Sequence, residues 1–163
     1  MTDYDLMVSQ LRELTDRESN WVANLANSSA LLFDSMSDLN WAGFYLVDND
    51  HTDKKSEIEA PRQLVLGPYQ GKPACIRIDE GKGVCGTCLK TGRVQRIDDV
   101  HEFPGHIACD SASNSEIVLP IRRHDGIVGV LDIDSPSYRR FSAEDQEGLV
   151  RFVKVLEQNL DLG

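Results

Sequence analysis

Two apolar runs joined by an Asp-Gly turn constrain the fold of this chain more than any other feature. The runs cover residues 117–123 and 127–135, and the turn lies at Asp125-Gly126. An Asp-Gly pair between two such runs is a strong signal for a tight β-hairpin. The chain therefore needs an antiparallel sheet, and its other segments must supply the remaining strands.

The second of these runs carries two aspartates that a buried strand would not normally contain. Side chains alternate across a strand, so Leu131 and Ile133 share one face. Asp132 and Asp134 lie on the other face. Charges at the end of an apolar strand are costly unless they are paired or used. Both aspartates are therefore candidate functional residues.

Further strands follow from composition. Branched and aromatic residues between turn signals predict strands at 40–47, 64–66, 74–78 and 94–97. We expect Gly67-Pro68 to end the second of these strands, because proline cannot donate a hydrogen bond to a sheet.

Helices are expected at both ends of the chain. Leucines at helical spacing, uninterrupted by Gly or Pro, predict helices within 3–36 whose leucines pack into the core. A capping-box pattern at 15–18 divides this segment in two. Two more helices are expected after the glycine turn at 81–83 and after Ser142. Helices around an antiparallel sheet define an α+β fold, and we expect a single domain over 1–163.

The composition excludes several classes of function. A net charge of -10 disfavours binding to nucleic acid or to anionic membranes, both of which need a basic surface. Residues 1–10 lack the pattern of a signal peptide, and no apolar run is long enough for a membrane span. We therefore expect a cytoplasmic protein. In that compartment, four cysteines indicate redox or metal chemistry rather than structural disulfides.

A loop that carries a cysteine precedes the hairpin. Residues 109–115 are Cys-Asp-Ser-Ala-Ser-Asn-Ser, whose polar side chains compete for the backbone hydrogen bonds of a helix or strand. Glu116 follows at the start of the strand. Cys109 and Glu116 therefore form a candidate reactive pair. The alternative is a surface loop with an unreactive thiol.

A glycine lies between two aromatic residues in the strand expected at 40–47. Alternation places Trp41, Gly43 and Tyr45 on one face. Gly43 would leave a hollow between the rings that could accept a methyl-sized group. The alternative is that both rings are ordinary core residues around a sheet glycine.

The cysteines allow three kinds of chemistry. A zinc site could use Cys85, Cys88, Cys109 and His106, although the sequence has no second CxxC. A thioredoxin-like CxxC would give Cys85 a lowered pKa at a helix N-terminus, but that motif expects a parallel βαβ context. In the third reading, Cys109 attacks an electrophilic sulfur, while Glu116 and Asp134 share a proton that assists departure of its oxygen.

Five ordered blocks of the sequence resemble one known family. The blocks are NWAGFYL, VLGPYQGKPACIRI, GKGVCGT, RIDDVHEFPGHIACDSASNSEIVLP and GIVGVLDIDS, and the match runs from about Asn20 to the closing helix. They are similar to the free methionine-(R)-sulfoxide reductases, a catalytic branch of the GAF domains. The resemblance implies a GAF-like six-stranded antiparallel sheet flanked by N-terminal and C-terminal helices. It implies reduction of free L-methionine-(R)-sulfoxide, with thioredoxin as electron donor and without a cofactor or metal.

The resemblance also assigns roles to the cysteines. It makes Cys109 the attacking thiol, and Cys75 the main thiol that resolves the resulting sulfenic acid. Cys85 is the third redox cysteine of the family and forms an alternative disulfide with Cys109. Cys88 stands where many relatives have alanine, so we expect a bystander.

The remaining roles concern the substrate. The resemblance implies that Glu116 and Asp134 protonate the sulfoxide oxygen and that Asp132 holds the substrate ammonium. Trp41 and Tyr45 match an aromatic cage for the terminal methyl group. Backbone N–H groups of the loop with Ser113 and Ser115 are expected to bind the carboxylate.

Competing functions come from other classes of protein. A non-catalytic GAF sensor would bind a small ligand or register oxidants, and a zinc module would bind a partner. The segment at 48–62 is longer than is usual for the family, which affects how this hairpin would cover a pocket. A homodimer is a further hypothesis that the sequence does not specify.

Overall fold

A six-stranded sheet forms the centre of the molecule. The computed structural model describes residues 1–48, 61–106, 111–124 and 126–160. The strands within these ranges are β1 (Trp41–Asp48), β2 (Gln63–Gly71), β3 (Arg77–Asp79), β4 (Gln95–Ile97), β5 (Ser115–Arg123) and β6 (Gly126–Ser135). Their order is β3-β2-β1-β6-β5-β4, and each neighbouring pair is antiparallel. The predicted α+β class and the antiparallel hairpin of β5 and β6 are confirmed.

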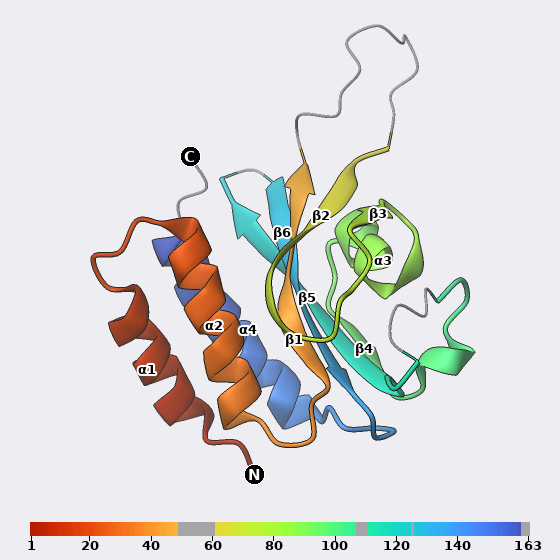
Figure 1. Ribbon diagram of the computed structural model, residues 1–163, viewed down its shortest axis with the longest axis horizontal. Coiled ribbons are helices and arrows are strands. Elements are labelled where there is room, and N and C mark those ends of the chain that lie inside the picture. Colours follow the sequence, from red (N-terminus) through yellow and green to blue (C-terminus); the bar gives the residue numbers. More distant parts are fainter. Residues whose placement is uncertain (49–60, 107–110, 125, 161–163) are drawn as a thin grey trace, which may run out of the picture.

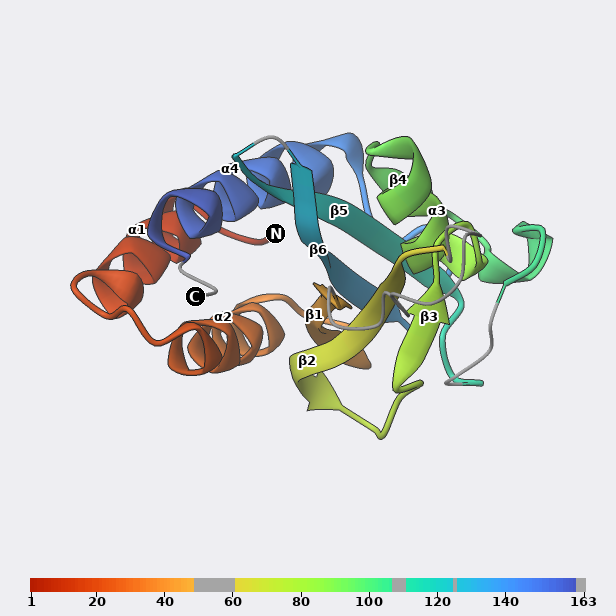
Figure 2. The ribbon, with the colours of Figure 1, turned by 90° about the horizontal axis from the view of Figure 1, so that it is seen from above.

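The described helices lie on both faces of the sheet. They are α1 (Tyr4–Thr15), α2 (Trp21–Ser35), α3 (Gly83–Thr91) and α4 (Ala143–Asn159), with one 3-10 turn at Val100–Glu102. Helices α1, α2 and α4 cover one face, and α3 lies alone on the other (Figures 1 and 2). Among these helices, none combines the length and the apolar character that a membrane span requires.

Strand alternation divides the core into two clusters, one on each face. Ala42, Phe44 and Leu46 of β1 pack with α1, α2 and α4. Trp41 and Tyr45 point to the opposite face and pack with α3. The same rule sends Leu131 and Ile133 of β6 to the first cluster, as the sequence predicted, and Val130 to the second. The face under α3 is therefore the one on which Asp132 lies.

Two strand predictions were wrong in their limits. Strand β2 continues through Gly67-Pro68 to Gly71, because the pairing with β1 shifts between Gly43 and Tyr45. A β-bulge leaves residues without a ladder partner, so it tolerates a proline that has no N–H to donate. Strand β3 begins at Arg77, so Cys75 lies in the connection before it and not within a strand.

The N-terminal helices divide where the sequence predicted, although with a different cap. Thr15 is the last residue of α1, and Asn20 caps α2 by accepting a hydrogen bond from the Ala23 N–H. Most predicted core leucines of this segment are buried or half-buried. Leu6 and Leu14 are exceptions and are 54% and 44% exposed. The predicted cap of α4 is confirmed as a full capping box between Ser142 and Asp145.

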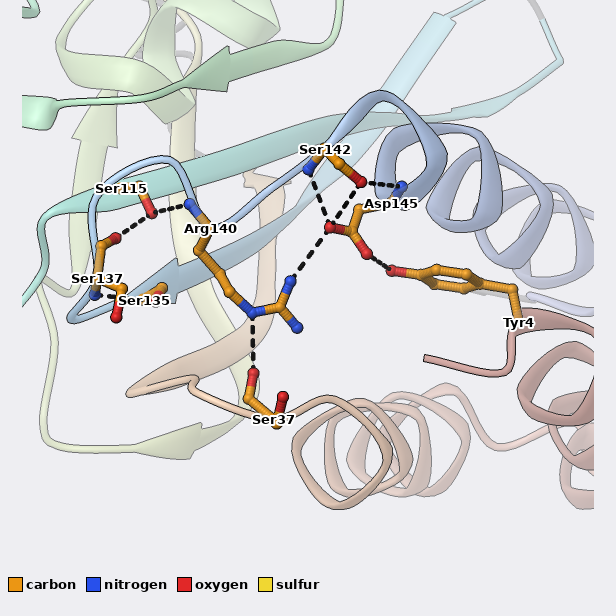
Figure 3. A network of polar contacts seen from close by, with 8 residues as sticks. All are labelled: Tyr4, Ser37, Ser115, Ser135, Ser137, Arg140, Ser142 and Asp145. Carbon is orange, nitrogen blue, oxygen red and sulfur yellow. Dashed lines mark hydrogen bonds and ion pairs between the residues drawn. The ribbon is translucent and has the colours of Figure 1, made fainter. Parts of the chain in front are cut away.

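Asp145 joins three distant segments of the chain (Figure 3). Its carboxylate accepts hydrogen bonds from the Tyr4 hydroxyl at 2.6 Å and from the Ser142 N–H at 2.9 Å. Arg140 donates to the same carboxylate at 3.1 Å and to the Ser37 carbonyl at 3.0 Å. Burial alone would raise the pKa of Asp145, but these donors outweigh it, so the pKa is lowered.

We expect Asp145→Asn to lower the free energy of unfolding at pH 7 by about 2 kcal/mol, the usual value of hydrogen bonds to a charged group. Because the folded-state pKa is lowered, the wild type keeps this contribution above the unfolded pKa of aspartate and loses it as the pH falls through the folded value. Urea denaturation from pH 7 to pH 3 measures both effects. The variant should have a flatter acid limb than the wild type.

Asp5→Asn is the matched control, because Asp5 pairs with Arg151 at the surface with 87% of its side chain exposed. An exposed pair of this kind contributes little. Equal losses in the two variants would contradict the role of the Asp145 network.

Candidate active site

A cavity of about 50 Å³ lies under α3, on the sheet face that carries the second core cluster. Its wall holds three carboxyl groups, two aromatic rings and one thiol, from Glu116, Asp132, Asp134, Trp41, Tyr45 and Cys85. All six were candidates from the sequence. The structure therefore brings together residues from β1, β5, β6 and α3 that are up to 93 positions apart, from Trp41 to Asp134.

The register of the sheet makes the three carboxyl groups converge. Glu116 of β5 lies directly opposite Asp134 of β6, and Asp132 lies two positions along the same strand on the same face. Strand β1 continues these rows, with Trp41 opposite Asp134 and Gly43 opposite Asp132. A slip of one residue would send every one of these side chains to the other face.

Burial and mutual repulsion keep protons on this cluster. Burial raises the pKa of Glu116 well above its usual value, and the nearby Asp132 and Asp134 charges raise it further. Burial also raises the pKa of Asp132, while hydrogen bonds from Glu116 and Cys85 oppose that rise. Burial and the neighbouring carboxyl groups therefore favour the protonated form of Glu116.

Cys85 lies in the first turn of α3 and is only 4% exposed. Burial raises the pKa of its thiol well above the usual value, and the negative charges of Asp132, Glu116 and Asp134 add to the rise. A helix N-terminus would lower the pKa of a thiol, as a thioredoxin-like motif requires. The environment here has the opposite effect, so the thioredoxin-like reading of Cys85 is wrong.

Aromatic side chains form another part of the wall. The Trp41 ring stacks on Tyr45 with centroids 5.8 Å apart and on Tyr69 with centroids 5.0 Å apart. The Tyr45 hydroxyl donates to the Cys75 carbonyl at 3.0 Å, and Trp41 Nε1 donates to the Lys72 carbonyl at 3.2 Å. Both rings are thus held at their polar ends by the connection between β2 and β3.

The hollow expected beside Gly43 is absent. A Cβ atom at Gly43 would lie 2.2 Å from the Cβ of Tyr69, so β2 already fills this space. Glycine is needed there for the close approach of the bulged strand, and not to leave room for a ligand. Tyr69 carried no functional signal in the sequence, because its contact with Trp41 depends on a bulge that was not predicted.

The two serines of the loop have different surroundings. Ser113 lines the cavity, and its Oγ accepts a hydrogen bond from the Asn40 amide at 2.9 Å. Ser115 is already within β5, where alternation turns it away from the face of Glu116. Its Oγ donates to the Ser137 carbonyl at 2.6 Å and accepts from the Arg140 N–H at 3.2 Å (Figure 3). Ser115 therefore stabilises the turn after β6 and does not line the cavity.

The cavity also contains two basic residues that had no assigned function in the substrate site. Lys82, which precedes α3, and His106 both line the wall. His106 Nε2 lies 3.9 Å from Glu116 Oε2. Burial lowers the pKa of His106 and raises the pKa of Glu116, so it favours the neutral forms of both groups across this contact. The sequence placed His106 only in a hypothetical zinc site.

The other cysteines differ in how the structure places them. Cys109 lies outside the described residues. Cys75 is half-buried and follows Pro73 and Ala74, which line the cavity. Cys88 is fully buried, with its Sγ 3.9 Å from the Val118 carbonyl oxygen, and burial raises its pKa to about 12. Such a thiol packs in the core, which agrees with the bystander role expected for it.

A GAF domain model matches residues 29–161. The free methionine-R-sulfoxide reductase of Escherichia coli K12 is 54% identical over 143 residues, which are 88% of this chain and 79% of that protein. The reduced form of fRMsr of Staphylococcus aureus superposes with a TM-score of 0.89 at 46% identity, covering 99% of this chain and 97% of the other.

A substrate complex is also among the similar structures. The free methionine-R-sulfoxide reductase of Neisseria meningitidis, solved with its substrate, has a TM-score of 0.86 at 39% identity and covers 96% and 87% of the two chains. The chain therefore belongs to the free methionine-R-sulfoxide reductase family of GAF domains.

We expect Gly43→Ala to destabilise the protein by about 1–3 kcal/mol, because overpacking a filled site forces backbone shifts. The new Cβ would also lie 2.7 Å from the Cα of Tyr69, so a rotamer change cannot relieve the clash. Urea denaturation measures the loss, and near-UV circular dichroism reports whether Tyr69 still stacks on Trp41.

Gly67→Ala is the control from the same bulge. Its new Cβ atom would lie 3.2 Å from the nearest atom, the Phe44 carbonyl oxygen. We expect a smaller loss for this variant. A neutral Gly43→Ala would show that β2 can move away from the cavity.

Proposed function

We propose that the protein reduces free methionine-R-sulfoxide to methionine through a thiol, sulfenic acid and disulfide cycle. The observation that carries this proposal is the buried Glu116 carboxyl group, whose pKa is raised, beside Asp132 and Asp134 in a cavity with an aromatic wall. A sulfoxide needs a proton on its oxygen while its sulfur is attacked. The family relationship supplies the substrate, and the cavity supplies the acid.

Glu116 acts as the general acid. Its proton is shared with Asp134, the residue directly opposite it in the sheet, and with Asp132. A carboxyl group that holds its proton near neutral pH is well matched to this role. As the sulfur–oxygen bond breaks, the oxygen passes to the attacking sulfur as a sulfenic acid hydroxyl.

Cys109 provides the attacking thiolate. The described residues on either side of its segment, His106 and Ser113, both line the cavity, and this supports the assignment. Attack on the sulfoxide sulfur releases methionine and leaves Cys109 as a sulfenic acid, the reversible first step of cysteine oxidation. Methionine sulfoxide is reduced by two electrons, and the thiol is oxidised by two.

Cys75 resolves the sulfenic acid, with formation of a disulfide and release of water. Its position next to Ala74 in the cavity wall supports this role. Cys85 serves as an alternative resolving thiol; its raised pKa makes it slower. Thioredoxin then reduces the disulfide by thiol exchange, which returns the enzyme to its starting state.

The amino acid part of the substrate binds to the remaining groups. Asp132 pairs with the ammonium, and this cation favours the ionised form of the carboxyl group despite its burial. Trp41 and Tyr45 contact the terminal methyl group. Backbone N–H groups near Ser113 bind the carboxylate, and the Asn40–Ser113 hydrogen bond supports this role by tying the loop to β1.

The direct test is a coupled assay of free methionine-R-sulfoxide reduction with thioredoxin and thioredoxin reductase. Oxidation of NADPH measures the turnover. We expect activity with this compound and none with the S epimer, because the relatives are named for the R epimer. Peptide-bound sulfoxide should not react, because the cavity is small. A non-catalytic GAF sensor would bind a ligand without turnover.

Size-exclusion chromatography with light scattering tests the proposed homodimer.

Two cysteine variants separate attack from recycling. We expect Cys109→Ser to abolish methionine formation, whereas Cys75→Ser should still form about one methionine per enzyme in a single turnover and then recycle slowly. Mass spectrometry of methionine after rapid mixing without reductant measures both. Cys88→Ser is the control and should keep full activity, because Cys88 packs in the core. Residual turnover in Cys109→Ser would reassign the attacking thiol.

We expect Glu116→Gln to slow the single-turnover rate by about 10²-fold or more, on the scale of general acid catalysis. In the wild type, the acid form is lost as the pH rises through the raised pKa of Glu116, so the rate should fall toward alkaline pH. This descending limb should be missing from the variant. Glu102→Gln, an exposed carboxyl group in the connection after β4, is the control. An unchanged rate in Glu116→Gln would remove this residue from the mechanism.

A further inference from the structure

We propose that the Cys85 thiol, the Glu116 and Asp132 carboxyl groups and the His106 imidazole form a binding site for Zn²⁺, and that the bound ion blocks the reaction. The ligand atoms of Cys85, Glu116 and Asp132 all lie within 4.8 Å of one another, and all three residues are buried. The inhibition rests on the proposed function, whereas the binding does not. This donor set differs from the CxxC-based zinc site considered for the sequence.

One buried oxygen atom of the cluster has no hydrogen-bond partner among the described residues, and a bound cation would take the place of that partner. Asp132 is only 6% exposed, and its Oδ1 has no hydrogen-bond partner among the described residues. A buried carboxylate oxygen without a partner costs free energy. Because Asp132 lines the cavity, a small cation at this place would satisfy the oxygen.

The chemistry of the donors selects zinc. A sulfur ligand disfavours Mg²⁺ and Ca²⁺, which take oxygen ligands, whereas thiolate, imidazole and carboxylate are the usual ligands of zinc. With Zn–S near 2.3 Å and Zn–N or Zn–O near 2.0–2.2 Å, tetrahedral ligands are about 3.3–3.8 Å apart. The 4.8 Å limit on the separations of the three donor atoms exceeds this spacing by about 1–1.5 Å, which side-chain rotation would have to close.

We assign the fourth position to His106, which lies outside the group of three whose ligand atoms are within 4.8 Å of one another. Its Nε2 is 3.9 Å from Glu116 Oε2, already near the ligand separation of a tetrahedral site. Asp134 lies beside these groups and adds negative charge to the cavity, so the wall favours a divalent cation. A metal ion at this place would replace the proton on Glu116. It would also occupy the space proposed for the substrate ammonium beside Asp132. Zinc should therefore compete with the substrate.

Cobalt and zinc titrations of the full-length, reduced protein test the proposal. We expect one Co²⁺ per chain, with the intense visible bands of tetrahedral cobalt and a thiolate-to-cobalt charge-transfer band in the near ultraviolet, both removed by Zn²⁺. Competition with a chromogenic chelator gives the zinc affinity. Because even loss of an outer partner weakens metal sites 10–100-fold, Cys85→Ser and His106→Ala should each weaken binding by about 10-fold or more.

Cys88→Ser is the matched control, since it removes a buried thiol of the same helix that is absent from the cluster. It should bind like the wild type. Far-UV circular dichroism checks that Cys85→Ser is folded, and His106→Ala tests the site without changing the buried core. An unchanged thiolate band in Cys85→Ser, or no binding by the wild type, would overturn the inference.

Activity provides a separate measurement. We expect Zn²⁺ to raise the apparent KM for free methionine-R-sulfoxide and EDTA to reverse the effect. Metal binding with the spectrum described, in a protein without reductase activity, would overturn the proposed function and leave the metal site intact. Reductase activity without metal binding would overturn the metal site and leave the proposed function intact.

Discussion

The pairing of Glu116 with Asp134 across β5 and β6 is the contact on which the rest of the site depends. Because Glu116 is buried and faces Asp134, repulsion between their charges favours the protonated form of Glu116. Asp132 extends the same row by one alternate position. An arrangement of like charges that costs free energy thus raises the pKa of the carboxyl group that we propose as the acid.

The two-sided organisation of the sheet makes this arrangement tolerable. The face covered by α1, α2 and α4 carries the larger apolar cluster. This cluster contains no residue of the cavity wall, so its packing does not depend on the site. The Asp145 network then fixes the N-terminal helix, the loop after β6 and α4 to one another. Since most of the apolar burial lies on that side, the face under α3 can hold buried carboxyl groups and a thiol without unfolding the domain.

Helix α3 adds a cover and also changes the chemistry of its own cysteine. Gly86 allows a close approach, because a Cβ there would lie 2.4 Å from the Asp79 carbonyl oxygen. This approach places Cys85 against Asp132 in a buried position, and both effects raise the pKa of the thiol. The same closeness of sulfur and oxygen donors that raises the pKa of the thiol is the basis of the proposed metal site.

The sequence by itself determined the order of the helices and strands and the side of β6 that faces the cavity. Period-two alternation separated Asp132 and Asp134 from Leu131 and Ile133, and the Asp-Gly turn fixed an antiparallel hairpin, because both depend only on neighbouring residues. Tertiary structure decided the rest. The bulge that brings Tyr69 onto Trp41, the strand start that turns Ser115 away, and the approach of His106 and Cys85 to Glu116 all depend on register and packing between distant segments. No local sequence pattern predicts these contacts. They join residues that are distant in the sequence, so they stabilise the protein only after the sheet and α3 have packed together.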